Sequence, residues 1–211
     1  MPADPDTAAV EHLRAADPVL RELIDEVGSE DLPDPRAGRP DDHYGALVRS
    51  IVGQQLSTRS AQAIFGRLLD RFGGRPPTPA EVIADDPDEL RTAAGLSHAK
   101  VRYLRSLAEH VIDGSLDLNA LDAMSDEEVM AALTAISGIG PWSAQVYMMF
   151  HLGRPDVVAA GDLGIRRAVM VRYGLPEMPS PAAVDEIAEA WRPYRTLASR
   201  YLWRSLYTTP V

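Results

Sequence analysis

The sequence contains no cysteine among its 211 residues. Disulfide bonds, thiolate zinc sites, iron–sulfur clusters and cysteine nucleophiles are therefore excluded. Long apolar runs are also missing, since no stretch approaches the roughly 18 residues that a membrane-spanning helix needs. The N-terminal residues 1–11 are acidic and lack the basic and apolar segments of a signal peptide. These absences predict a soluble, cytoplasmic protein that does not bind membranes.

Positive charge is scarce, and the formal net charge is −10. Lysine occurs once, at Lys100, and the other twenty basic residues are arginine. Residues 1–42 hold twelve acidic and four basic residues, whereas the remainder is nearly balanced. Acidic proteins are uncommon partners of nucleic acid, but a binding face needs only local positive charge. The charge pattern therefore argues against nucleic-acid binding without excluding it.

Strand-like alternation of apolar and polar residues is absent, and helical spacing of apolar residues predicts an all-α protein. Clusters of glycine and proline separate the apolar segments and mark where helices end. The expected helices cover residues 8–27, 44–52, 58–72, 79–84, 87–94, 97–113, 126–135, 142–151, 163–173, 181–191 and 194–206.

A hairpin motif lies within residues 133–144, where Gly138-Ile139-Gly140 joins two predicted helices. Glycine permits positive φ and close approach of another chain, and Pro141 suits the first position of a helix. Exposed N–H groups at the start of the second helix would form an anion site that fits a DNA phosphate. The plain alternative is a glycine turn between two packed helices.

Asp162 stands 24 positions after Gly138 and directly precedes a predicted helix. Its plainest role is to cap that helix. Together with the hairpin, however, it resembles the helix-hairpin-helix DNA glycosylase superfamily, which includes endonuclease III and the adenine and 8-oxoguanine glycosylases. In that superfamily a required aspartate follows the hairpin at this distance. The resemblance implies that Asp162 is catalytic, whether or not it also caps the helix.

Two further segments are similar to the 3-methyladenine DNA glycosylase II family. Residues 50–58 match a segment that wedges a side chain into the duplex, which implies Gln55, or Leu56 beside it, as the wedge. The alternative is a glutamine that caps the next helix. Residues 95–104 match a Gly-Leu-x-x-x-Lys helix, which implies a DNA-facing role for Lys100.

A third segment, residues 191–204, is similar to the C-terminal helix of that family, whose last tryptophan faces the extruded base. The resemblance places Trp203 in the base pocket and Trp191 in the core. The chain departs from the family in two ways. Some relatives carry an N-terminal β domain, which this chain lacks, and some carry an aromatic residue where this chain has Val146. The second difference leaves the base preference open.

The resemblance also implies a wider set of site residues. The base pocket is expected to contain Trp203, Trp142 and Tyr147. The DNA backbone is expected to contact Gly138, Ile139, Gly140, Ser143, Lys100 and Arg166. A structural Na⁺ or K⁺ is a further possibility at the backbone carbonyls of Thr134, Ile136 and Ile139.

The implied reaction is hydrolysis of the N-glycosidic bond of an extruded alkylated purine such as 3-methyladenine or 7-methylguanine. Such a base is cationic, so it stacks well on tryptophan and leaves without much acid assistance. Asp162 would stabilise the oxocarbenium-like sugar and orient the attacking water. Strand cleavage is not expected, because Trp142 stands where the lyases of the superfamily carry their lysine. No metal or redox cofactor is required.

We expect two helical lobes flanking a cleft for DNA and the extruded base. Residues 1–42 are expected to form an acidic helix and a proline-rich loop that pack on the C-terminal lobe. Residues 43–151 are expected to form the central lobe, which includes the hairpin. Residues 152–211 are expected to form the C-terminal lobe, which carries the catalytic aspartate. The expected partner is double-stranded DNA with damaged bases, bound by a monomer in the bacterial cytoplasm at the nucleoid.

Three alternatives stay open. The chain could be a non-catalytic helix-hairpin-helix module that only holds phosphate. It could also be a glycosylase for other lesions, such as hypoxanthine, ethenoadenine or oxidised bases. A purely structural helical protein is the third alternative. The five histidines show no zinc-binding spacing.

Overall fold

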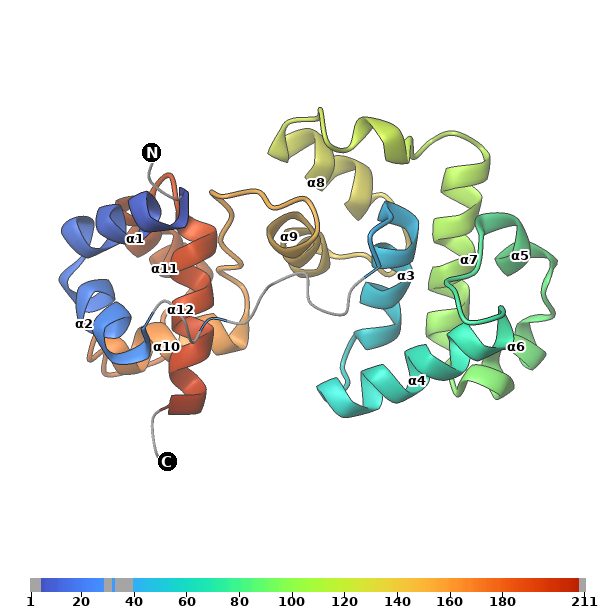
Figure 1. Ribbon diagram of the computed structural model, residues 1–211, viewed down its shortest axis with the longest axis horizontal. Coiled ribbons are helices and arrows are strands. Elements are labelled where there is room, and N and C mark those ends of the chain that lie inside the picture. The colour runs from blue at the N-terminus through green and yellow to red at the C-terminus, as the bar shows by residue number, and fades with distance from the viewer. Residues whose placement is uncertain (1–4, 29–31, 33–39, 209–211) are drawn as a thin grey trace. The chain divides into compact units, whose positions relative to one another are not determined.

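The computed structural model describes residues 5–28, 32 and 40–208 (Figure 1). Over these residues the chain forms helices and no strand, which confirms the all-α class. None of the described helices is long and apolar enough to cross a membrane. The helices are α1 Pro5–Ala16, α2 Pro18–Val27, α3 His43–Gly53, α4 Thr58–Arg71, α5 Pro79–Ala84, α6 Pro87–Ala94, α7 His98–Ile112, η1 Leu118–Ala120, α8 Asp126–Thr134, α9 Pro141–Phe150, α10 Leu163–Arg172, α11 Pro181–Ala188, η2 Glu189–Trp191 and α12 Arg195–Thr208.

Side-chain caps and prolines explain where the helices begin. Proline occupies the first turn of α5, α6, α9 and α11, where its missing N–H has no helical partner to lose. Reciprocal capping boxes open α5 and α8, between Thr78 and Glu81 and between Ser125 and Glu128. These local signals account for the agreement between the predicted and observed starts of the helices.

The single helix expected over residues 8–27 is wrong, because the chain forms α1 and α2 with a break at Asp17. Asp17 is extended, with φ −142° and ψ 117°, and its carboxylate accepts from the N–H groups of Val19 and Leu20. Pro18 has no N–H to continue the preceding helix. The capping bonds and the proline therefore override an apolar pattern that continues across the break.

The chain divides into two compact units. Unit 1 combines the N-terminal segment up to Ala37 with Gly153–Val211. Within it, α2 and α10 both pack against α12, and α1 packs against α2 and η2. Trp191 and Tyr201 are fully buried in its core, which confirms the core position predicted for Trp191.

Unit 2 comprises Gly38–Leu152 and holds helices α3 to α9. Helix α3 packs against α4, α7 and α9, while α8 packs against α9. Leu47 and Ile51 on α3, Leu104 on α7 and Leu133 on α8 are buried in its core. This packing brings the end of α3 close to α7 and α9, where most of the predicted site residues of unit 2 lie.

The core of unit 1 contains a buried carboxylate, Asp17, which is 6% exposed. Its Oδ1 accepts from the N–H groups of Val19 and Leu20 at 2.8 and 3.2 Å. Its Oδ2 accepts from the hydroxyl of Tyr173 at 2.5 Å and from Nε1 of Trp191 at 2.9 Å. Burial, together with the bond to Asp17, raises the pKa of Tyr173, so its hydroxyl keeps the proton that it donates. Asp17 thus joins α2 to the end of α10 and to η2.

Replacing Asp17 with alanine is expected to lower the free energy of unfolding by roughly 3 kcal/mol or more, because each hydrogen bond to a charged group contributes about 1.5–3 kcal/mol. Urea unfolding followed by tryptophan fluorescence measures the loss. Asp42→Ala is the matched control, since Asp42 caps α3 through one backbone partner, Gly45 N, and such a cap contributes about 1 kcal/mol. Equal losses in the two variants would contradict the role assigned to Asp17.

Candidate functional site

The predicted hairpin joins α8 to α9 in unit 2. Gly138 has φ +89°, and a Cβ at this position would lie 2.1 Å from the ring of Tyr103. Ile139 is buried, so its side chain ties the turn to the core. Pro141 begins α9, and no side chain of the described residues caps this helix start. The N–H groups at the start of α9 therefore suit an anion such as phosphate.

Residues 54–57, which we call the wedge loop, connect α3 to α4. Gln55 has φ +58°, the one positive value among the described non-glycine residues. Such a conformation costs about 1–3 kcal/mol and persists only where the surroundings enforce it. The side chain of Gln55 is exposed, and Leu56 beside it is 37% exposed. Both side chains therefore stand at the surface, as a wedge requires, and their role in DNA stays a prediction.

Two side chains hold the wedge loop in place. The amide Nε2 of Gln54 donates to the carbonyl of Gly138 at 2.8 Å and lies 3.2 Å from Oγ of Ser143. The ammonium of Lys100 donates to the carbonyl of Val52, in the last turn of α3, at 2.7 Å. The wedge loop, the hairpin and α7 are thereby joined by side-chain bonds. Sequence reasoning missed the bond of Gln54, because no local pattern reveals a partner 84 positions away.

Lys100 and Ser143 lie deeper than expected for DNA-contacting side chains. Lys100 is half-buried rather than freely exposed, and burial lowers the pKa of its ammonium. Ser143 is 7% exposed, so its hydroxyl faces Gln54 and only its backbone N–H belongs to the helix start. Both residues still line a cavity of about 360 Å³, with Tyr103 and Gly138 in the same wall. Their contact with DNA stays a prediction.

A second cavity, of about 300 Å³, lies between α3, α4 and α9, and we call it the α3–α9 cavity. Arg49 on α3, Leu56 of the wedge loop, and Trp142 and Tyr147 on α9 contribute to its wall. Trp142 is 44% exposed, so its indole offers a face for stacking, whereas Tyr147 is almost fully buried. Val146, where some relatives carry an aromatic residue, lines the cavity as well. The structure thus brings two of the three predicted pocket residues together in unit 2.

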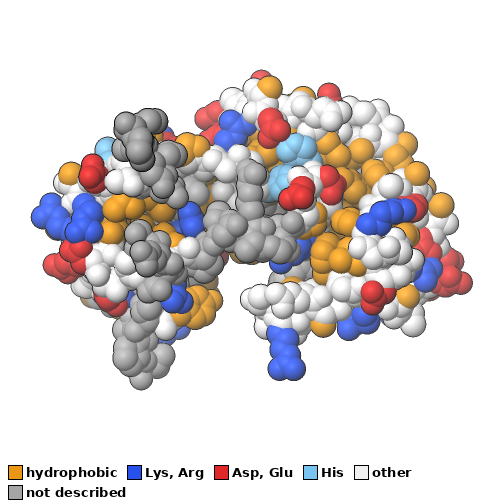
Figure 2. Space-filling model, viewed as in Figure 1, with side chains coloured by type: hydrophobic (Ala, Val, Ile, Leu, Met, Phe, Trp, Pro, Cys, Tyr) orange, Lys and Arg blue, Asp and Glu red, His pale blue; other side chains and the backbone are white. Residues whose placement is uncertain are grey.

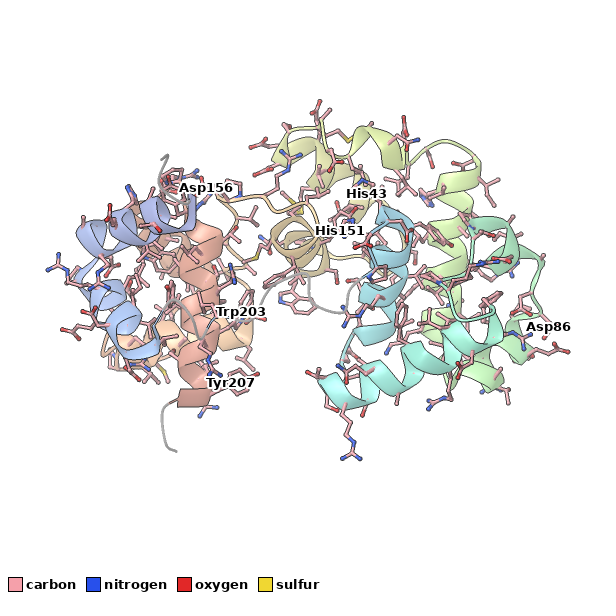
Figure 3. All side chains as sticks on the ribbon, viewed as in Figure 1. His43, Asp86, His151, Asp156, Trp203 and Tyr207 are labelled. Carbon is pink, nitrogen blue, oxygen red and sulfur yellow. The ribbon has the colours of Figure 1, made fainter. Side chains whose placement is uncertain are left out.

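A cluster of titratable side chains borders this cavity. His43 Nδ1 lies 2.7 Å from the hydroxyl of Tyr147 and 3.1 Å from Nε2 of His151, and His43 Nε2 lies 3.4 Å from Asp122. Figure 3 shows His43 and His151 beside each other, and Figure 2 shows histidine and acidic side chains exposed together in this part of unit 2. Burial, with the negative charges of Asp122 and Asp42, raises the pKa of Tyr147.

Sequence reasoning named Tyr147 but missed His43 and His151 as its neighbours. Position 43 lies at the start of α3 and position 151 just beyond α9, so only tertiary packing brings them together. A search for zinc-like spacing could not find them, and the described residues contain no group of three His, Cys, Asp or Glu that could hold a metal ion.

In unit 1, Asp162 is the N-cap of α10, so its plain capping role is present. Its Oδ1 accepts from the N–H of Ile165 at 2.8 Å and from Nε1 of Trp203 at 2.9 Å. Trp203 lies on α12 (Figure 3). The approach of the indole depends on Gly164, where a Cβ would lie 2.9 Å from Oδ1 of Asp162 and 3.2 Å from the Trp203 ring. The structure therefore pairs the predicted catalytic carboxylate with the predicted pocket tryptophan.

Two other predictions about the site remain untested. Arg166 lies on α10, but its Nε donates to the carbonyl of Pro179 at 2.8 Å, which gives the side chain a structural bond besides any contact with DNA. The carbonyl of Ile136 accepts from the N–H of Ile139 at 3.0 Å, so one of the expected cation ligands also closes the turn. A monovalent cation at the hairpin stays a prediction.

Comparison with known proteins matches residues 48–193 to a family model described as HhH-GPD superfamily base excision DNA repair protein. The chain is similar to a Schizosaccharomyces pombe protein named DNA-3-methyladenine glycosylase 1, with 36% identity over 97% of this chain and 91% of that protein. It is also similar to DNA-3-methyladenine glycosylase 2 of Escherichia coli, with 28% identity over 77% of this chain and 57% of that protein.

Solved structures show the same fold. A 3-methyladenine DNA glycosylase of Schizosaccharomyces pombe in complex with abasic DNA superposes with a TM-score of 0.86 at 33% identity, over 96% of this chain and 98% of that chain. A DNA-3-methyladenine glycosidase of Bacillus halodurans gives a TM-score of 0.82 at 37% identity, over 98% of this chain and 91% of that chain.

The two hairpin glycines are expected to respond differently to substitution. Gly138→Ala should lower the free energy of unfolding by about 3 kcal/mol, because it combines a strained positive φ with a clash against Tyr103. Gly140→Ala should change it by no more than about 0.5 kcal/mol, since no atom lies within 4 Å of a Cβ there. Urea unfolding measures both variants.

Tyr103→Ala added to Gly138→Ala provides the internal control. Tyr103→Ala removes the clashing ring, so in the Gly138→Ala background it should restore part of the lost free energy of unfolding. The cost of the positive φ at position 138 should remain. A simple sum of the two single effects would show that Tyr103 is not what restricts position 138.

Proposed function

Since the chain belongs to the HhH-GPD superfamily of base excision DNA repair proteins, we propose that it is a monofunctional DNA glycosylase that releases alkylated purines such as 3-methyladenine and 7-methylguanine. The observation that carries the proposal is Asp162, a carboxylate at the start of α10, 24 positions after the hairpin glycine, with the indole of Trp203 bound to it. The names of its relatives support the alkylated-purine substrate.

The first requirement of the reaction is to expose the damaged base. A base inside a duplex is out of reach, so the enzyme extrudes it, and the unstacking costs a few kcal/mol. The wedge loop supports this step, because Gln55 and Leu56 present exposed side chains that fill the vacated space. The bonds of Gln54 and Lys100 to the backbone prepare the loop for insertion before DNA arrives.

The second requirement is to hold the DNA backbone. The uncapped N–H groups at the start of α9 donate hydrogen bonds to a phosphate, and the positive end of the helix dipole favours the anion. Gly140 keeps this approach open, since no protein atom lies within 4 Å of where its Cβ would be. Phosphate contacts of this kind hold DNA of any sequence, which suits an enzyme that must survey the whole duplex.

The third requirement is chemical. As the bond between C1′ and the base breaks, its electron pair leaves with the base and the sugar becomes positively charged. The ionised carboxylate of Asp162 stabilises this charge and takes up a proton from the water that adds to C1′. The bonds from Ile165 N and Trp203 Nε1 fix the carboxylate in one orientation, so little reorganisation is needed during the reaction.

The preference for alkylated purines rests on their charge. A purine methylated at N3 or N7 is cationic, so it leaves as a neutral base. Before it leaves, its positive charge strengthens stacking on an aromatic face by about 0.5–2 kcal/mol of binding free energy. Trp142 is 44% exposed and Trp203 is half-buried, so both indoles have accessible surface.

We infer that the enzyme acts as a monomer on double-stranded DNA, in the cytoplasm at the nucleoid.

Asp162→Asn tests the proposal directly. The variant keeps an oxygen acceptor for Ile165 N and Trp203 Nε1, so the cap should survive, while the negative charge is lost. Single-turnover release of 7-methylguanine should fall at least about 100-fold, the range for removing one preorganised electrostatic group. Binding of the lesion duplex, measured by titration, should be retained.

Asp86→Asn is the matched control, because Asp86 caps α6 through two backbone N–H groups and lies on the surface of unit 2 (Figure 3). It should release base at the parent rate. A folded Asp162→Asn variant with the parent rate would remove Asp162 from the mechanism and favour the non-catalytic alternative.

The enzyme is expected to leave an intact abasic strand. Strand cleavage by a lyase begins with an imine between an amine and C1′ of the sugar. The indole nitrogen of Trp142 cannot form an imine, and the ammonium of Lys100, the only lysine, is engaged with the carbonyl of Val52. Borohydride present during turnover should therefore trap no protein–DNA adduct, and strands should break only after alkali.

The Lys100→Met variant is assayed in parallel, because burial lowers the pKa of the Lys100 ammonium and so increases the share of free amine. A trapped adduct, or nicking without alkali, that disappears in Lys100→Met would make the enzyme a lyase and overturn the prediction.

A further inference from the structure

The segment that leads to Asp162 crosses the core of unit 1 without forming a helix or a strand. Its residues 157–160 are at most 6% exposed, and Asp162 follows them at the start of α10. Buried backbone N–H and C=O groups need hydrogen-bond partners, which a helix or a sheet would otherwise supply. The start of α12 supplies several of these partners, so contacts with α12 set the path of the segment.

Thr196, in the first turn of α12, bonds to the backbone of this segment. Its N–H donates to the carbonyl of Pro155 at 3.0 Å, and its hydroxyl donates to the carbonyl of Arg154 at 2.6 Å. The same hydroxyl accepts from the N–H of Val157 at 3.1 Å. Residues 154–157 are therefore fixed at the start of α12.

Asp156 adds charged hydrogen bonds at the same place, and we call this arrangement the Asp156 clamp. Its Oδ1 accepts from Nε of Arg195 at 2.7 Å, and its Oδ2 accepts from Nη1 of Arg192 at 2.6 Å. Nη2 of Arg195 donates to the backbone carbonyl of Asp156 at 2.6 Å. The side chains of Asp156 and Arg195 are only 21% and 15% exposed, so salt screens this pair less than a surface pair. The fork of Arg195 fixes the direction of the segment as well as its distance from α12.

The Asp156 clamp and the bond between Asp162 and Trp203 join the same two stretches of chain at two points. Trp203 follows Arg195 by eight positions on α12, which is about 12 Å at 1.5 Å per residue. Asp162 follows Asp156 by six positions along the segment. Figure 3 shows Asp156 near the start of α12 and Trp203 farther along the same helix. Because the helix between the two points is rigid, slippage at the clamp would move Asp162 relative to the indole.

Resting on the proposed glycosylase function, we propose that Asp156 is a positioning residue for Asp162. The clamp sets the register of residues 157–162 along α12 and so holds the Asp162 carboxylate at Trp203. Asp156 acts through this register and takes no part in the chemistry, since two arginines engage its carboxylate. A displacement of about 1 Å caused by a distant change can slow a reaction about 100-fold. Loss of the clamp should therefore slow the chemical step and leave DNA binding nearly intact.

Two substitutions of Asp156 and one control test this role. Asp156→Ala removes the clamp, whereas Asp156→Asn keeps an amide oxygen for Nε of Arg195 and is the milder variant if the alanine protein does not fold. Glu26→Ala is the matched control, because Glu26 forms a two-bond pair with Arg172 in the same unit. Arg172 ends α10, so this pair lies at the opposite end of the helix from Asp162.

Single-turnover release of 7-methylguanine is measured with the duplex saturated by protein, and binding of the lesion duplex is measured by titration. Asp156→Ala should slow release about 10- to 100-fold at nearly unchanged affinity, and Asp156→Asn should slow it less. Glu26→Ala should release base at the parent rate even though it also loses an ion pair. Hydrogen exchange of the amides of residues 157–163 should be faster in Asp156→Ala and unchanged in Glu26→Ala.

A double-mutant cycle with Trp203→Phe separates positioning from a general loss of stability. Trp203→Phe removes the N–H that binds Asp162 and keeps an aromatic ring. If the clamp acts through this bond, Trp203→Phe should slow release less in the Asp156→Ala background than in the parent. Rate losses that simply multiply would show that Asp156 does not act through the contact between Asp162 and Trp203.

Three further results would overturn the inference. The first is a folded Asp156→Ala variant with the parent rate. The second is an equal loss of rate in Glu26→Ala, which would assign the effect to stability alone. The third is unchanged hydrogen exchange of residues 157–163 in Asp156→Ala, whatever its activity. Parent protein that releases no base would instead refute the proposed function, and the exchange measurement would still show whether the clamp holds the segment.

Discussion

The close contact between Gly138 and the ring of Tyr103 is the constraint on which the rest of unit 2 depends. It is possible only without a side chain at position 138, and it fixes the hairpin against α7. With the hairpin fixed, the carbonyl of Gly138 is in place to hold Gln54, and Gln54 holds the wedge loop next to the strained Gln55. The missing Cβ at position 138 therefore helps to position both the proposed phosphate site and the proposed wedge.

Each of the two units holds a different part of the proposed machinery. In the proposed reaction, unit 1 supplies the carboxylate of Asp162, which would stabilise positive charge on the sugar, and the indole of Trp203, which is bound to that carboxylate. Unit 2 holds the hairpin, the wedge loop and the α3–α9 cavity, with Trp142 in the wall of that cavity.

Local signals were sufficient to predict most of the fold. Apolar spacing and clusters of glycine and proline separated the predicted helices, and the glycines located the hairpin. The structure adds capping boxes at the starts of α5 and α8. The break at Asp17 was missed because the apolar spacing continues across Asp17-Pro18, although the cap and the proline are local signals. The buried partners of Asp17, Tyr173 and Trp191, could not be predicted, since they are more than 150 positions away. The His43 cluster and the bond of Gln54 were missed for the same reason. A sequence read in isolation reveals helices and motifs, whereas contacts between distant helices require the packed structure.

We propose that this chain removes damaged bases rather than merely binding DNA. The most direct measurement is to incubate the parent protein with a panel of duplexes, each with one defined lesion, and to identify the released base by chromatography. We predict free 3-methyladenine and 7-methylguanine from their duplexes and no base from undamaged DNA. Tight binding to every duplex with no base released from any of them would contradict the account.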